Sequence, residues 1–320
     1  MKDKHKPHVR HGRFFNHVYD TISGRLREFF TTLGTLAVKN TRMREKHDKL
    51  QANITWQTER TFPERSDDLK ITWLGHATFL IQVAGINILT DPVFYEISRT
   101  TPRYVDPVVT PKDLPPIDVV LISHNHPDHV DSKSLRGLLR HHPHVLLPLG
   151  DRTWFKHRGF RHAREFSWWE MHDVNGVQFT FLPANHWSGR HLIDMNRSLW
   201  GSWMITAGDK QIYFAGDTAH GDHFTAIAQA YPKIDVVLMP IGPNGPDTMR
   251  ETHVSAQEAV QSFIELDGTH FIPMHWGTFK FGTDLFMLPH QLLHTAWQEA
   301  GTQVTSKQLR VLKHGETCSF

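Results

Sequence analysis

The sequence predicts an α/β protein with one large layered domain and an N-terminal extension. From about Leu69, short apolar runs separated by turn residues alternate with helical patterns, which is typical of α/β domains built in layers. The 320 residues are enough for one large domain plus an extension, and the first part of the chain differs from the rest by its basic composition. We therefore assign residues 1–64 to the extension and 65–320 to the domain.

Strands are predicted where short apolar runs are bounded by turn residues. These runs are 71–74, 78–83, 87–90, 118–123, 145–147, 178–183, 201–206, 211–215, 236–240, 271–274 and 309–312. Apolar residues at helical spacing predict helices at 132–139, 224–230, 255–266 and 289–299. The third helix opens with Ser255-Ala256-Gln257-Glu258, the spacing of a capping box, which marks its N-terminus.

Residues 1–50 combine basic charge with an apolar stripe. They contain 12 Lys and Arg and 5 Asp and Glu, a local balance of +7, whereas the whole chain has a formal net charge of +2. The stripe consists of Phe15, Val18, Tyr19, Ile22, Leu26, Phe29, Phe30 and Leu33. This pattern suits a helix lying on an anionic membrane surface, and it suits equally a helix that packs on the main domain with its basic residues exposed.

The composition excludes several classes of protein. The single cysteine, Cys318, allows no intrachain disulfide and no cysteine-rich metal site, so His and carboxylate groups must hold any metal. No stretch approaches the roughly 20 apolar residues of a membrane span, and the start lacks the apolar core of a signal peptide. We therefore expect a cytoplasmic protein, peripheral to the membrane if the basic segment binds lipid. The near-neutral domain offers no extended basic surface for nucleic acid.

The run Ser-His-Asn-His-Pro-Asp-His at residues 123–129 is the strongest functional signal. It places His124, His126, Asp128 and His129 directly after a predicted strand. Neutral imidazole and carboxylate are the ligands that zinc and similar divalent metals prefer. A tight turn can aim His124 and His126 at one ion and the other two side chains at a second ion, about 3.5–4 Å away.

Three more predicted strands end at residues able to bind metal, and strand ends collect functional groups in one crevice of an α/β sheet. A bridging carboxylate would offset part of the repulsion between two dications. The assignment is His124, His126 and His186 for one ion, Asp128, His129 and His275 for the other, and Asp217 as the bridge.

Further candidates stand near these ligands. Asp91, at a strand end, could accept the second N–H of a ligating imidazole, although a turn residue before Pro92 is as good an interpretation. His76 and His253 are candidates of the same kind; His253 could contact the leaving group or a phosphate oxygen, and an ordinary structural role suits either histidine equally.

Two tryptophans and two arginines complete the set of candidates. We expect Trp187 and Trp276, which flank two ligands, to wall the cleft and exclude water rather than to recognise a head group. Arg190 and Arg250 are candidate phosphate contacts, but their charge and position are more typical of solvated surface arginines.

The order His-x-His-x-Asp-His, followed by His, Asp and His, resembles the metallo-β-lactamase superfamily over roughly residues 65–320. This resemblance implies a four-layer αββα sandwich with the metal ions at one edge, between two sheets. The flanking motifs look like the N-acyl-phosphatidylethanolamine-hydrolysing phospholipase D branch: WLGHAT (73–78), LTDP (89–92), ANHW (184–187), FAGDT (214–218) and MHWGTF (274–279). Arg13-Phe14-Phe15-Asn16 is similar to the basic aromatic start of the bacterial members.

The branch resemblance implies zinc, a membrane phospholipid substrate and cleavage of its phosphodiester. Two zinc ions sharing a water would lower its pKa and hold a hydroxide in line with a bound phosphodiester, and Asp128 and His253 are the candidate catalytic residues. The same ligands could hold iron or manganese. Residues 243–250 and 280–288 depart from the branch pattern at segments expected to border the substrate entrance. The metal chemistry is therefore better supported than the lipid specificity.

Two other functions stay open. A zinc-dependent lactonase or esterase, or a phosphodiesterase acting on a soluble substrate, would use the same site, because activated water also attacks carbonyl groups. A non-catalytic domain that binds membranes or partners is disfavoured because all seven ligands are present. The sequence leaves a homodimer open.

Overall fold

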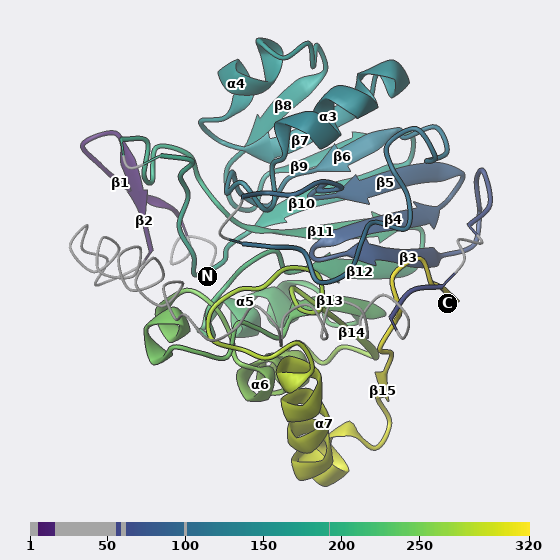
Figure 1. Cartoon of the computed structure of the whole chain (residues 1–320), viewed down its shortest axis with the longest axis vertical. Coiled ribbons are helices and arrows are strands. Elements are labelled where there is room, and N and C mark those ends of the chain that lie inside the picture. The colour runs from purple at the N-terminus through teal and green to yellow at the C-terminus, as the bar shows by residue number, and fades with distance from the viewer. Residues whose placement is uncertain (1–5, 17–55, 59–61, 99–100, 192) are drawn as a thin grey trace.

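The computed structural model describes residues 6–16, 56–58, 62–98, 101–191 and 193–320. Two seven-stranded mixed sheets pack against each other, and helices cover their outer sides (Figure 1). The predicted four-layer αββα sandwich is therefore confirmed. Among the described residues, no helix is both long and apolar enough to cross a membrane.

The first sheet has the order β16-β3-β4-β5-β6-β7-β8. Its strands are β3 (Lys70–Gly75), β4 (Thr78–Val83), β5 (Ile86–Thr90), β6 (Val119–Leu121), β7 (His144–Pro148), β8 (Ala163–Phe166) and β16 (Thr317–Ser319). Pairing is antiparallel from β16 to β5 and parallel from β5 to β8. The parallel strands β5 and β6 therefore end at the same edge of the sheet.

The second sheet has the order β15-β14-β13-β12-β11-β10-β9. Its strands are β9 (Met171–Val174), β10 (Val177–Leu182), β11 (Ser202–Ala207), β12 (Lys210–Phe214), β13 (Val236–Pro240), β14 (His270–Met274) and β15 (Gln308–Leu309). Pairing is antiparallel from β9 to β12 and parallel from β12 to β15.

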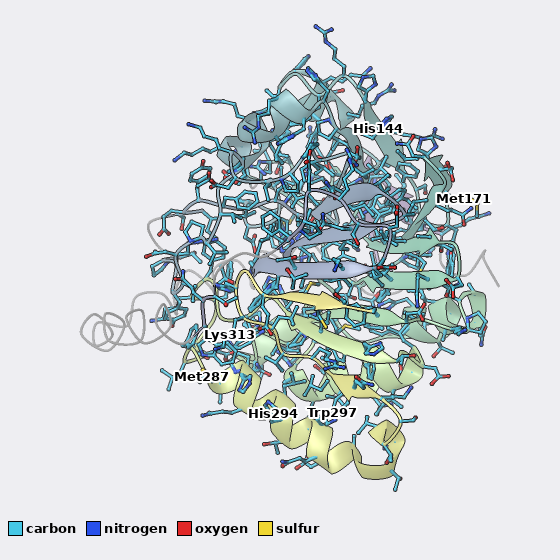
Figure 2. All side chains as sticks on the ribbon, turned by 90° about the vertical axis from the view of Figure 1, so that its right-hand side faces the viewer. His144, Met171, Met287, His294, Trp297 and Lys313 are labelled. Carbon is cyan, nitrogen blue, oxygen red and sulfur yellow. The ribbon has the colours of Figure 1, made fainter. Side chains whose placement is uncertain are left out.

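Helices cover both outer faces. On the first sheet lie α3 (Ser132–Leu138), the turn η2 (Leu139–His141) and α4 (Arg152–Lys156). On the second lie α5 (His223–Ala230), η3 (Asp247–Glu251), α6 (Ala256–Glu265), α7 (Leu288–Ala300) and η4 (Gly301–Val304). The predicted capping box at Ser255 and Glu258 is present. Figure 2 shows His294 and Trp297 on α7 near one end of the molecule and His144 toward the other.

Alternating side chains of the central strands divide between two apolar layers. In β4, Phe79 and Ile81 join the layer that contains Phe181 and Trp203 of the second sheet, whereas Leu80 joins the layer under α3, with Leu135. Because successive side chains of a strand point to opposite faces, a strand covered on both sides must be apolar at nearly every position. This explains why β6 is wholly apolar and why β4 and β5 are apolar at most positions on both faces.

Within the sandwich, the structure adds three strands and one α-helix that the apolar pattern does not reveal: β8, β9, β16 and α4. Each is short, and β8, β9 and β16 each carry an exposed side chain. The strand predicted at 309–312 is wrong in extent, because only Leu309 of that run belongs to β15. The remaining predicted strands and helices are confirmed to within a few residues.

A hairpin of β1 (His8–Arg10) and β2 (Arg13–Phe15) precedes the sandwich. Phe15 was predicted to begin an amphipathic helix, and it lies instead in a strand. The rest of that helical stripe falls within 17–55, outside the described residues. Phe14 is buried in the main hydrophobic cluster of the domain, so part of the segment assigned to the extension packs on the domain.

Candidate metal centre

The 123–129 motif occupies the loop that connects β6 to α3. Its turn is closed by hydrogen bonds from the backbone N–H groups of His129 and Val130 to the carbonyl of His126. Asp131 then caps α3 by accepting hydrogen bonds from the backbone of Lys133 and Ser134. The tight turn predicted from the sequence is thus set by its own backbone bonds and by the helix that follows.

The three other proposed ligands follow strands of the second sheet: His186 comes after β10, Asp217 after β12 and His275 after β14. Gly216, with φ +59°, lets the chain approach the motif loop closely, since a Cβ there would lie 2.5 Å from the Cβ of Ser123. His275 itself has φ +57°. A non-glycine residue in this region is unusual and is found most often at functional sites.

The structure brings all seven proposed ligands together. Potential ligand atoms of His124, His126 and His186 lie within 4.8 Å of one another, and so do those of Asp128, His129, His275 and His76. Asp217 Oδ2 lies between the groups, 3.9 and 3.8 Å from the Nε2 atoms of His124 and His186 and 3.2 Å from those of His129 and His275. The bridging role of Asp217 stays a prediction, and its carboxylate lies where it could contact an ion held by either group.

The polar atoms at this centre fit a group of divalent cations. His126 Nε2, His129 Nε2, His275 Nε2 and Asp217 Oδ1 are buried without a hydrogen-bond partner among the described residues. Buried polar atoms are normally paired. His126 Nδ1 also lies 2.8 Å from His124 Nε2, so one of these two nitrogens carries a proton in the metal-free protein. Imidazole and carboxylate atoms of this kind form typical zinc sites.

The electrostatics of the cluster separate its histidines into two sets. Burial lowers the pKa of His126 and His76 to about 3. Burial also opposes the charged form of His275, but the Asp217 and Asp128 carboxylates outweigh it and raise its pKa to about 9. The same carboxylates raise the pKa of His129. Metal binding must displace the protons held there, since imidazole binds metal in its neutral form.

Asp91 holds His129 from behind. Its buried carboxylate accepts hydrogen bonds from His129 Nδ1 at 2.7 Å, from Ser123 N at 2.8 Å and from Ser123 Oγ at 2.5 Å. The hydrogen bond to Nδ1 turns the Nε2 lone pair of His129 toward the cluster, which is the usual way a second partner orients a metal-binding imidazole. The carbonyl of Thr252 does the same for His186 by accepting from its Nδ1 at 2.8 Å.

The other two candidate histidines also lie in the cluster. His76 Nε2 is 3.1 Å from Asp128 Oδ2, and its ring centroid is 4.2 Å from that of His275. His253 Nε2 is 3.4 Å from Asp217 Oδ2. Both side chains are buried, so neither is a surface histidine.

A cavity of about 320 Å³ opens beside these ligands. His126 and Asp128 line it, together with Ile97, Ser98, Thr101, Pro127, Trp187, Gly189, Arg190, His191, Met195 and Phe281. The ring of Trp187 lies 4.2 Å from that of His126, the position expected of a cleft wall. Trp276, in contrast, packs in the core, 5.7 Å from Trp73 between ring centroids, and lines a smaller cavity behind His275.

Both candidate arginines are half-buried and hydrogen-bonded within the protein, so the favoured interpretation of freely solvated arginines needs correction. Arg190 Nη1 donates to the carbonyls of Asn125 and Val130 at 3.1 and 2.7 Å and so holds the motif loop, while its side chain lines the cavity. Arg250 donates to Glu258 and to the carbonyl of Pro243, away from that cavity.

The two divergent segments contribute differently to the cavity. Phe281, from 280–288, lines it, whereas residues 243–250 do not. Asn244 N instead donates to Asp284 Oδ2 at 2.6 Å, and Thr283 N donates to the Gly245 carbonyl at 3.2 Å. Residues 243–250 therefore support the segment that borders the cavity.

A buried network behind the motif is absent from the sequence prediction. Asn125 Nδ2 and Ser198 Oγ donate to Asp151 Oδ1 at 2.9 and 2.7 Å, while Asp151 Oδ2 is buried without a partner among the described residues. Asn125 Oδ1 accepts from Gly189 N at 2.7 Å. The network joins the motif loop to the loop that follows β10. Only the position of Asn125 between two histidines hints at it in the sequence.

Asp151→Asn is expected to gain stability relative to the parent protein as the pH rises from about 4 to about 6. Burial raises the pKa of Asp151 from 3.8 to about 6. Between these pH values the Asp151 carboxyl is ionised in the unfolded parent protein but still largely protonated in the folded one. The parent therefore loses stability as the pH rises, whereas the variant, whose amide does not titrate, keeps its stability. Urea unfolding of the metal-free proteins at several pH values measures the difference. Parallel pH curves for the variant, the parent and the exposed control Asp222→Asn would contradict this explanation.

Comparisons with known proteins place this geometry in context. A family model described as a beta-lactamase superfamily domain matches residues 86–276. The chain is 33% identical over 235 residues to N-acyl-phosphatidylethanolamine-hydrolyzing phospholipase D 1 of Caenorhabditis elegans, covering 68% of this chain and 66% of that protein. It is also 33% identical over 235 residues to the mitochondrial enzyme of that name from Saccharomyces cerevisiae, covering 69% and 50%. The matched part thus spans half to about two thirds of these relatives.

Solved structures show the same fold. An isothiocyanate hydrolase from Delia radicum gut bacteria superposes with a TM-score of 0.64 at 21% identity, covering 78% of this chain and 98% of the other. A possible metal-dependent hydrolase from Veillonella parvula has a TM-score of 0.62 at 17% identity, covering 79% and 100%. At such identities the likeness concerns the fold alone.

Proposed function

Because the chain belongs to the metallo-β-lactamase superfamily of metal-dependent hydrolases, we propose that it is a dinuclear zinc phosphodiesterase of the phospholipase D type. Its proposed substrates are phospholipids of the N-acyl-phosphatidylethanolamine class. The observation that carries the proposal is the cavity of about 320 Å³ beside the ligand cluster. It combines Ile97, Trp187, Met195 and Phe281 with two proposed ligands, so an apolar chain could lie in it while its phosphodiester faces the cluster.

The two relatives named for this activity add support, since their likeness extends over 68% and 69% of this chain. The proposed ligands are the seven residues of the cluster, with Asp217 shared between the two ions. When bound, divalent ions lower the pKa of coordinated water and offset negative charge on phosphate oxygens. Iron or manganese in place of zinc would preserve this chemistry.

The side chains around the ligands have separate roles in the proposal. Asp128 is half-buried and borders the cavity, and its Oδ2 lies 3.1 Å from His76 Nε2 and 3.4 Å from His129 Nε2, so it is placed to exchange a proton with a group bound there. His253 faces Asp217 and can donate from Nε2 to a leaving oxygen. Trp187 covers His126 and excludes water from that side of the cluster.

The test is metal content by mass spectrometry, run beside hydrolysis of N-acyl-phosphatidylethanolamine in vesicles. We expect about two metal ions per chain and release of phosphatidic acid. Two ions with no lipid turnover would retain a hydrolase and reject the phospholipid, and lactones and soluble phosphodiesters would then be the substrates to assay. A protein that binds no metal after reconstitution would overturn the proposal.

The same vesicles test the proposed membrane partner. The balance of +7 in residues 1–50 supports association of this segment with anionic lipid and hence a peripheral location. Co-sedimentation with anionic vesicles, and none with zwitterionic vesicles, is the expected result. Equal binding to both would argue against an electrostatic contact.

A further inference from the structure

The N-terminal hairpin is attached to the loop that forms one wall of the cavity. Figure 1 shows β1 and β2 at one side of the molecule, apart from the two large sheets. Phe14 N donates to the carbonyl of Asn196 at 2.8 Å. The Arg13 guanidinium donates to the carbonyl of Met195 and, at 3.3 Å, to that of Ile193. Buried Phe14 fixes the hairpin to the core.

Asn16 connects the two ends of this loop. Its Nδ2 donates to the carbonyl of His186 at 2.9 Å, and its Oδ1 accepts from Trp200 Nε1 at 3.0 Å. The same indole N–H lies 3.0 Å from the Ala184 carbonyl. One side chain near the start of the chain therefore fixes the backbone of a proposed metal ligand to a fully buried tryptophan.

The loop between these ends carries much of the cavity wall. Trp187, Gly189, Arg190, His191 and Met195 all line the cavity. The loop is closed across its base by hydrogen bonds from Asn196 N to the Ser188 carbonyl at 2.7 Å and from Ser188 N to Asn196 Oδ1 at 3.2 Å. The contact of Phe14 with the Asn196 carbonyl is made at this closure.

We infer that residues 13–16 form a clasp that completes the metal centre and the cavity wall. Asn16 is a positioning residue for His186: it holds the backbone from which the imidazole reaches the cluster, while Thr252 holds the ring. Arg13 is a positioning residue for substrate, because it fixes the carbonyls of the 193–195 stretch behind Met195. The inference rests on the proposed role of His186 as a ligand.

Two substitutions separate these roles. Asn16→Leu keeps the size of the side chain and removes these two hydrogen bonds. Zinc affinity should therefore fall by about tenfold, the lower end of the effect of removing a partner that orients a ligand, and a chelator should remove zinc faster than from the parent. Arg13→Met keeps the aliphatic length and the Asn16 contacts. It should leave the rate of zinc loss unchanged and raise the KM for phosphodiester substrate several-fold, with little change in kcat.

Zinc retained against time in chelator, measured by mass spectrometry, and steady-state kinetics of the zinc-loaded proteins provide the two readouts. Val9→Thr is the matched control. Val9 lies on the same hairpin and is 61% exposed, and the substitution keeps a β-branched side chain. Trp200→Phe removes the indole N–H but leaves the Asn16 donor to His186, so it should affect zinc loss less than Asn16→Leu.

The clasp is rejected if Asn16→Leu and Arg13→Met lower thermal stability alike and leave both zinc loss and KM at the Val9→Thr values. Failure of the proposed ligand set looks different: His186→Ala would then retain the same number of zinc ions as the parent. Failure of the clasp can therefore be told apart from failure of the proposed ligand set.

Discussion

Asp217→Asn is expected to release at least one metal ion and to abolish turnover while leaving the fold largely intact. Asp217 Oδ2 lies within 4 Å of the Nε2 atoms of five histidines, those of residues 124, 129, 186, 253 and 275. An amide keeps the shape of the side chain but removes its charge and one acceptor oxygen. Two neighbouring dications would then lose the anion that offsets their repulsion.

The fold should survive because the Asp217 carboxylate contacts imidazoles of the cluster, whereas the loop is held by backbone bonds such as that from Ala215 N to the Leu238 carbonyl. Metal content, kcat and circular dichroism of the variant measure the three parts of the prediction. Asp222→Asn, at the exposed start of α5, is the matched control. A fully active Asp217→Asn protein with its normal metal content would exclude the bridging role.

The fold and the cluster could be predicted because both leave local patterns in the chain. Strands buried on two faces, such as β4, appear as runs in which apolar residues predominate at consecutive positions. The motif at 123–129 packs its donors into one turn, and His186, Asp217 and His275 each follow a recognisable strand. Parallel pairing of β12, β13 and β14 then aligns the ends of these strands at one edge.

The contacts that complete the site left no such pattern. The Thr252 carbonyl that holds His186 is a backbone group, which every residue possesses. Asn16 reaches His186 across 170 positions of sequence, and Asp151 meets Asn125 only because two loops pack together. Arg190 resembles a solvated arginine in sequence, since its partners are carbonyls of another loop. The missed contacts of the site therefore join segments far apart in the sequence, and most of them end on backbone carbonyls.

Substitutions of Asp91 should separate the stability of the site from its affinity for metal. In Asp91→Ala, the backbone N–H of Ser123 and the Nδ1–H of His129 lose the carboxylate that accepts hydrogen bonds from both. Breaking a buried, charged hydrogen-bond pair costs about 3–5 kcal/mol. The free energy of unfolding of the metal-free protein, measured in urea, should fall by about that amount. Asp209→Asn, in the exposed turn between β11 and β12, is the control for removing a carboxylate.

Asp91→Asn should cost less stability and mainly weaken metal binding. Its amide oxygen can still accept from Ser123 N, but its NH₂ group would then face His129 Nδ1 and favour the ring tautomer whose Nε2 carries the proton. That proton points at the cluster, where the lone pair is needed, so we expect metal affinity to fall by about 10–100-fold. Competition with a chelator measures the affinity. Equal losses of stability in the Asn and Ala variants, with unchanged metal affinity in both, would show that Asp91 supports the loop alone and does not orient His129.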